Sequence, residues 1–216
     1  MSPRRPRFMY RFQRELADCR KYYDRAVASI SKDEAFQNVI IEMAFLKACL
    51  AWEDFLEQSF VYLMSPAKTK GKKPKVYVKA PSKDAAYKIL GVQQGRRDYV
   101  EWGDPELIIE RSKAFFSRGK PFVPVIQKYR QHLNDMRKVR NRIAHRSPLA
   151  VKKFEDTVRG RTGGVPDGIV PGRFLKDTAP QSMLGTPGGE ARPSVFELWI
   201  KVLEDATNEI LASAFQ

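Results

Sequence analysis

The stretch RNRIAH (residues 140–145), inside DMRKVRNRIAHRSP (residues 135–148), ends a long amphipathic helix that the sequence predicts. Upstream of it and within it, large side chains recur at alternating steps of four and three residues, which places them on one helix face. These side chains are Tyr129, Leu133, Met136, Arg140 and Ile143. The arginine stands among apolar neighbours, and burying a guanidinium without a partner costs several kcal/mol. We therefore expect Arg140 to meet a negative charge, from another side chain or from a ligand phosphate.

Length and composition bound what the chain can be. Its 216 residues suit one domain, or one domain with a sizeable insertion. The balance of 39 Lys and Arg against 25 Asp and Glu gives a net charge of +14, which favours a polyanion such as nucleic acid as partner. No apolar run approaches the roughly 20 residues of a membrane span, and the basic N-terminus lacks the apolar core of a secretion signal. We expect a cytoplasmic protein in which Cys19 and Cys49 are reduced thiols packed in a core.

Helix signals follow one another along the chain and predict an all-α fold in a single domain over residues 1–216. We expect a bundle of four or five helices, with further short helical segments in and around its irregular insertions. A short pairing at residues 76–78 is the one strand candidate. Capping side chains are available at Ser31 or Asp33, Ser82, Asp104 and Ser194. The expected helices cover residues 8–30, 34–64, 83–90, 105–116, 122–146, 149–160 and 195–215.

Two further helices, besides the motif helix, have an apolar face that can be traced. On the last helix it comprises Phe196, Trp199, Ile200, Leu203 and Ile210. On the helix at 34–64 it comprises Val39, Met43, Leu46, Leu50, Leu56, Phe60 and Leu63. Glu53 lies on this second face, so it is our candidate partner for Arg140. The alternative is that Glu53 stands at the edge of the face and reaches water.

Two segments interrupt the helical pattern. An insertion at about residues 65–100 begins with SPAKTKGKKPKVYVKAPS, in which six lysines are punctuated by glycine and proline. We expect it to contact an RNA backbone through Lys70, Lys72, Lys73 and Lys75, with a solvated surface as the alternative. Residues 160–193 hold eight glycines and five prolines and predict an extended irregular loop. The alternative, which the sequence leaves open, is that this loop packs against the surface of the domain.

The spacing Arg140-Asn141-x3-His145 resembles the signature of HEPN-domain ribonucleases. The resemblance implies a HEPN-like helical bundle and a metal-independent endoribonuclease of a toxin–antitoxin or antiphage system. It also implies a homodimer with a composite active site, no cofactor, and an antitoxin or defence-system partner protein. The alternative is a non-catalytic HEPN-like module that binds RNA, a nucleotide or a partner protein.

The residue types of the motif suit RNA cleavage by the substrate's own 2′-hydroxyl. A histidine moves protons near neutral pH, and an arginine stays charged and bonds two phosphate oxygens at once. Asn141 and Lys138 share the helix face of His145, where Asn141 can orient the imidazole and Lys138 can add positive potential.

One helix does not aim Arg140 and His145 at the same phosphate, because positions five residues apart lie about 140° apart around an ideal helix. Either the helix ends near Ala144, or two copies of the motif face each other across a two-fold axis. The second histidine, His132, falls on a different face, and no cluster with metal-ligand spacing accompanies the motif.

Overall fold

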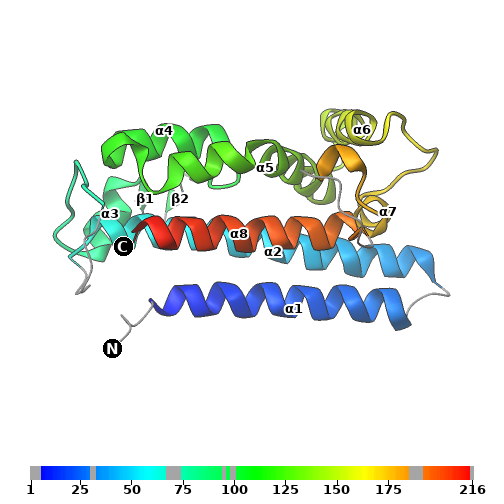
Figure 1. Cartoon of the computed structure of the whole chain (residues 1–216), viewed down its shortest axis with the longest axis horizontal. Helices are drawn as coiled ribbons and strands as arrows, with labels where there is room; N and C mark the ends of the chain where they lie inside the picture. Colours follow the sequence, from blue (N-terminus) through cyan, green and yellow to red (C-terminus); the bar gives the residue numbers. More distant parts are fainter. Residues whose placement is uncertain are drawn as a thin grey trace. The chain divides into compact units, whose positions relative to one another are not determined.

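The computed structural model describes residues 6–29, 33–66, 74–93, 96–97, 101–184 and 192–214. The fold is all-α, as predicted (Figure 1). Its helices are α1 (Arg7–Ser29), α2 (Glu34–Met64), α3 (Lys83–Ile89), α4 (Pro105–Phe115), α5 (Phe122–Ala144), α6 (Pro148–Thr162), α7 (Pro171–Lys176) and α8 (Val195–Ala214). Two single turns of 3₁₀-helix, η1 (Ser117–Gly119) and η2 (Gln181–Met183), and the paired two-residue strands β1 (Val92–Gln93) and β2 (Arg96–Arg97) complete the described elements. In that part of the chain no helix is long and apolar enough to cross a membrane.

Side-chain caps explain where the helices begin. The Asp33 carboxylate accepts the backbone N–H of Phe36 at 2.9 Å, so α2 starts at the next residue, as predicted. Ser82, Asp104 and Ser194 cap α3, α4 and α8 in the same way. The predicted caps at Asp33, Ser82, Asp104 and Ser194 are therefore confirmed, and Ser31, the alternative for α2, lies outside the described residues.

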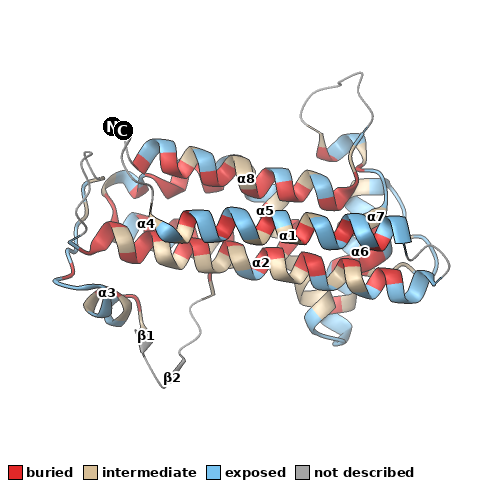
Figure 2. Ribbon diagram, turned by 90° about the horizontal axis from the view of Figure 1, so that it is seen from below, coloured by how far each residue is buried: buried red, intermediate tan, exposed pale blue. Residues whose placement is uncertain are grey.

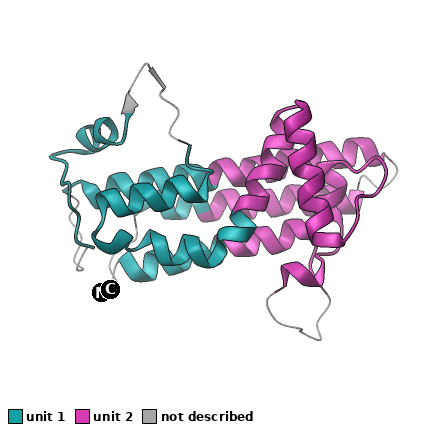
Figure 3. Ribbon diagram, turned by 90° about the horizontal axis from the view of Figure 1, so that it is seen from above, with its two compact units in different colours: residues 1–12, 52–133, 204–216 teal, residues 13–51, 134–203 magenta. Residues whose placement is uncertain are grey.

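The chain divides into two compact units, coloured separately in Figure 3. Unit 1 comprises residues 1–12, 52–133 and 204–216, and unit 2 comprises residues 13–51 and 134–203. Helices α1, α2, α5 and α8 each contribute residues to both units. The prediction of one domain over residues 1–216 stays a prediction.

Unit 1 has an aromatic core around Phe60. The ring of Phe60 stacks on Phe122 with centroids 4.2 Å apart and meets Trp102 and Phe116 edge-on. The Trp102 indole N–H donates to the Glu57 carboxylate at 3.0 Å. Val76 forms an isolated bridge with Phe116, so the strand candidate at residues 76–78 amounts to one bridge.

Unit 2 is built on the predicted face of α8. Phe196, Trp199, Ile200 and Leu203 are all fully buried, and Phe196 stacks on Tyr23 with centroids 4.4 Å apart. Cys19 and Cys49 are buried and free of disulfides, as expected. Burial raises the pKa of the Cys19 thiol to about 11. Figure 2 shows how burial is distributed along the helices.

The predicted face of α2 is wrong in its first half. Val39 and Met43 are both 51% exposed and Leu50 is 48% exposed, while Ile41 and Phe45 are fully buried. Apolar residues surround this part of α2 on all sides, so the 3.6-residue period does not select one face. The neighbouring helices in unit 2 select it instead.

The Gly/Pro-rich segment is more ordered than the predicted extended loop. It contains α7 and η2, and it buries Phe174 and Leu175. At Gly172 a Cβ atom would lie 2.5 Å from the backbone oxygen of Asn38, so only glycine permits this contact of α7 with α2. This ordered structure is described up to residue 184, because residues 185–191 lie outside the described ranges.

Candidate functional site

The motif occupies the C-terminal end of α5, in unit 2. Arg140 and Asn141 are half-buried, whereas His145 directly follows the helix and is exposed. The His145 backbone N–H donates to the Asn141 carbonyl at 2.9 Å, so the backbone keeps its helical hydrogen bonding to this point. The helix thus ends at Ala144, near the predicted position.

The side chains of Arg140 and Asn141 contact each other. Arg140 Nη1 donates to Asn141 Oδ1 at 3.2 Å, and Arg140 Nε is shielded from solvent. No side-chain hydrogen bond joins Asn141 to His145 within the described ranges, so Asn141 orients the guanidinium in this structure rather than the imidazole. The hydrogen bond thus links the first two residues of the motif and does not include the third.

Glu53, the expected acidic partner of Arg140, belongs to unit 1, whereas Arg140 belongs to unit 2. The Glu53 carboxylate lies against Gly103, where a Cβ atom would stand 2.9 Å from its Oε1. Pairing between Glu53 and Arg140 stays a prediction.

The sequence did not single out Glu42, an acidic residue of α2 in unit 2. Its Oε1 accepts the backbone N–H of Gly172 at 2.9 Å. Burial raises the pKa of Glu42, while the Gly172 hydrogen bond and the charge of Arg142 oppose that rise. Glu42 thus joins α2 to α7 and lies within the electrostatic reach of the motif helix.

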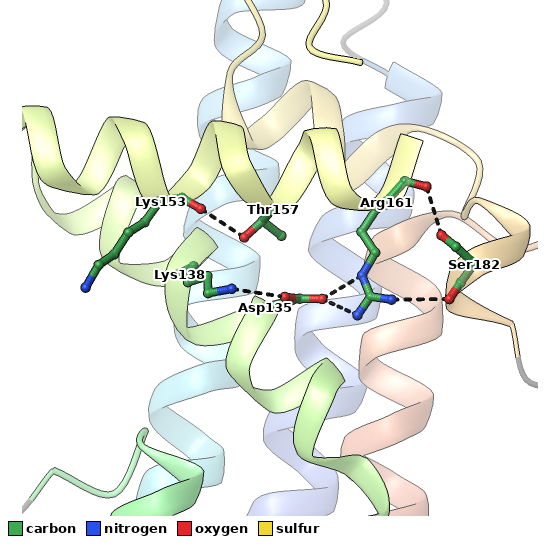
Figure 4. Close-up of polar contacts among 6 residues, drawn as sticks. All are labelled: Asp135, Lys138, Lys153, Thr157, Arg161 and Ser182. Atoms are coloured by element: carbon green, nitrogen blue, oxygen red, sulfur yellow. Dashed lines mark hydrogen bonds and ion pairs between the residues drawn. The ribbon is translucent and has the colours of Figure 1, made fainter. Parts of the chain in front are cut away.

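Lys138, expected to add positive potential to the site, is held in an ion pair. Its Nζ lies 3.6 Å from Asp135 Oδ1, as Figure 4 shows. The other oxygen of Asp135 accepts bonds from Nε of Arg161 at 2.7 Å and from its Nη2. The side chains of Asp135 and Arg161 are only 8% and 7% exposed, so this ion pair is buried between α5 and α6.

Arg161 also fixes η2 to α6. Its Nη1 donates to the Ser182 carbonyl at 3.2 Å, and the Ser182 hydroxyl donates back to the Arg161 carbonyl at 2.8 Å (Figure 4). Asp135 lies in the quoted stretch, but nothing in the local sequence relates it to an arginine 26 residues later. The cluster therefore becomes visible only in the folded chain.

Three of the four lysines proposed to bind RNA, Lys70, Lys72 and Lys73, lie outside the described residues. Lys75 is described and exposed, and its backbone carbonyl accepts the N–H of Ser117 at 2.8 Å. Tyr77 is 57% exposed. The RNA-binding role of this segment stays a prediction.

Among the described residues, no group of three or more His, Cys, Asp or Glu side chains is placed to hold a metal ion. No protein-family model, curated protein sequence or solved structure matches the chain. What the protein does is therefore inferred from its own residues and their geometry.

Proposed function

We propose that this chain is a metal-independent endoribonuclease of the HEPN type. The observation that supports the proposal is the intact Arg140-Asn141-x3-His145 motif at the end of α5, in an all-α fold, with its histidine exposed. The net charge of +14 suits an RNA substrate. By the same resemblance, the protein acts in the cytoplasm in a toxin–antitoxin or antiphage system, with an antitoxin or other defence protein as partner.

The proposed reaction uses the substrate's own 2′-hydroxyl as nucleophile. His145 takes the proton of this hydroxyl, and the oxygen forms a bond to the adjacent phosphorus. The bond from phosphorus to the 5′-oxygen breaks, and that oxygen takes a proton from solvent and leaves as a hydroxyl, while His145 releases the proton it accepted to solvent. Arg140, steadied by Asn141 at 3.2 Å, offers a fixed positive charge to the phosphate oxygens in the transition state. The products carry 2′,3′-cyclic phosphate and 5′-hydroxyl ends.

We further propose that the active site is shared between two copies of the chain. On an ideal helix, positions 140 and 145 lie about 140° apart, so a continuous helix would turn Arg140 and His145 to different sides. A two-fold axis near the ends of two α5 helices would bring Arg140 of one copy towards the partner copy's histidine.

The test is incubation of the purified full chain with total RNA in EDTA. We expect wild type to cut RNA and to leave 2′,3′-cyclic phosphate ends. Arg140→Ala and His145→Ala should each abolish cleavage, a loss of at least about 10²-fold. Lys138→Ala should only weaken it, because that ammonium is held by Asp135.

Strict dependence on added Mg²⁺ would contradict this mechanism. Circular dichroism of each variant serves as the folding control, since His145 is exposed and its loss should leave the helices intact.

A non-catalytic binding module is the second candidate function. It is favoured because the hydrogen bond between Arg140 and Asn141 does not include His145. Tight RNA binding by wild type without any cleavage, over a range of pH and protein concentration, would select this alternative.

A further inference from the structure

Helix α6, which begins three residues after His145, has an exposed face with an unusual composition. Leu149, Lys152, Lys153 and Asp156 follow the i, i+3, i+4, i+7 spacing of one helix face, and all four are exposed. Leu149 is 61% exposed, the largest fraction among the exposed large hydrophobic residues described. An apolar side chain in solvent between cations suits a ligand that carries both negative charge and apolar surface.

The two lysines of this face, and Arg146 just before α6, are not neutralised by ion pairs among the described residues. Asp156 pairs with Arg159 at 3.0 Å, further along α6. Across the described residues, no ion pair involves Arg146, Lys152 or Lys153. These three differ in this respect from Lys138 and Arg161, which both meet Asp135. Figure 4 shows the Lys153 side chain directed away from that buried pair.

The chain itself keeps this face close to the motif. Four Cα–Cα steps separate His145 from Leu149, so their Cα atoms lie within about 15 Å of each other. The Ser147 hydroxyl accepts the N–H of Ala150 at 3.3 Å and so begins α6 immediately after the motif. A strand of RNA with its reacting phosphate at His145 therefore has further phosphates within reach of α6.

We infer that Arg146, Lys152, Lys153 and Leu149 form the surface that binds single-stranded RNA beside His145. The lysines and the arginine contact backbone phosphates, and Leu149 packs against an unstacked base. A duplex keeps its bases stacked inside, where Leu149 does not reach them. As a statement about the substrate of a nuclease this inference rests on the proposed function, but RNA binding itself is measurable without cleavage.

The experiment measures binding of a short 2′-O-methylated RNA, which lacks the nucleophilic hydroxyl, by fluorescence anisotropy at a series of salt concentrations. For Lys152→Gln/Lys153→Gln we expect the salt slope to fall by about 1.4, since each phosphate contact to a single strand contributes about 0.7. The matched control is Lys83→Gln/Lys88→Gln, which removes the same charge from exposed positions of α3. Leu149→Ala should weaken binding of single strands without changing the slope.

In the cleavage assay, the α6 double variant should raise KM and leave kcat unchanged. Equal loss of slope in the α3 control would overturn the inference, because net charge alone would then account for binding. So would an unchanged slope, or duplex RNA bound as tightly as the single strand. If binding follows the expected pattern but wild type cleaves no RNA, the proposed nuclease activity is contradicted and the RNA-binding surface on α6 is supported.

Discussion

Asp135, in α5, and His145, directly after the end of α5, lie within one stretch of eleven residues, and the groups around them differ in their surroundings. Asp135 is buried and bonded by Arg161, so its charge is satisfied inside unit 2. His145 is exposed, and the cations beside it on α6 carry no ion pair among the described residues. The buried pair holds α5 and α6 together, whereas the exposed group meets solvent or a ligand. Burial and charge pairing thus separate the polar residues that stabilise the fold from those that are available to a ligand.

The largest effect that separates the two groups concerns stability. Asp135→Ala leaves the guanidinium of Arg161 buried without its carboxylate, and we expect the free energy of unfolding to fall by about 3–5 kcal/mol. His145→Ala should leave it unchanged. Urea denaturation of the full chain measures both.

Replacing both partners tests whether the charge itself is the cause. Asp135→Leu/Arg161→Met removes the two charges together and should recover most of the lost stability. A loss below about 1 kcal/mol in Asp135→Ala would mean that the pair behaves like an exposed one.

The second effect concerns the activity of the exposed group and tests whether two copies of the chain share each active site. If each active site takes Arg140 and His145 from different copies, mixing Arg140→Ala chains with His145→Ala chains restores activity. We expect about a quarter of wild-type activity, because half of the dimers are mixed and each of those has one complete site. Neither variant should be active alone, and sedimentation should show a dimer.

A site completed within one chain predicts no recovery on mixing. A monomer that cleaves RNA at high dilution would rule out sharing while leaving the roles of Arg140 and His145 intact.

The smallest effect concerns Glu42, which is partly buried beside the motif helix. Because burial raises its pKa, the folded chain binds this proton more tightly than the unfolded chain. The contribution of Glu42 to stability is therefore greatest below the ordinary pKa of a glutamate and falls as pH rises through the raised value. Glu42→Gln keeps an acceptor for the Gly172 N–H and removes this dependence on pH. At pH values above the raised pKa of Glu42, the variant should therefore be more stable than wild type.

Urea unfolding between about pH 4 and pH 8 measures the difference. Glu110→Gln, at an exposed position of α4, serves as control. Equal changes in the two variants would show that general charge, rather than burial of Glu42, sets the pH dependence.

The sequence by itself determined those features of the fold that depend on residues adjacent in the chain. The Asp33 cap and Pro66 bound α2 to within two residues of its ends, because capping and proline act on the adjacent turn. The buried face of α8 followed from its period, since polar residues occupy the other faces. The motif could be recognised for the same reason, because its residues lie within six positions of one another in the sequence.

Only the tertiary structure decided what depends on distant residues. Helix α2 is apolar around its circumference, so which of Val39 and Phe45 is buried depended on the helices packed against it. The pairing of Asp135 with Arg161 joins residues 26 positions apart, and the packing of Gly172 against Asn38 joins α7 to α2. Local propensity does not encode such contacts, because burial and charge pairing are set by whichever surfaces the chain brings together when it folds.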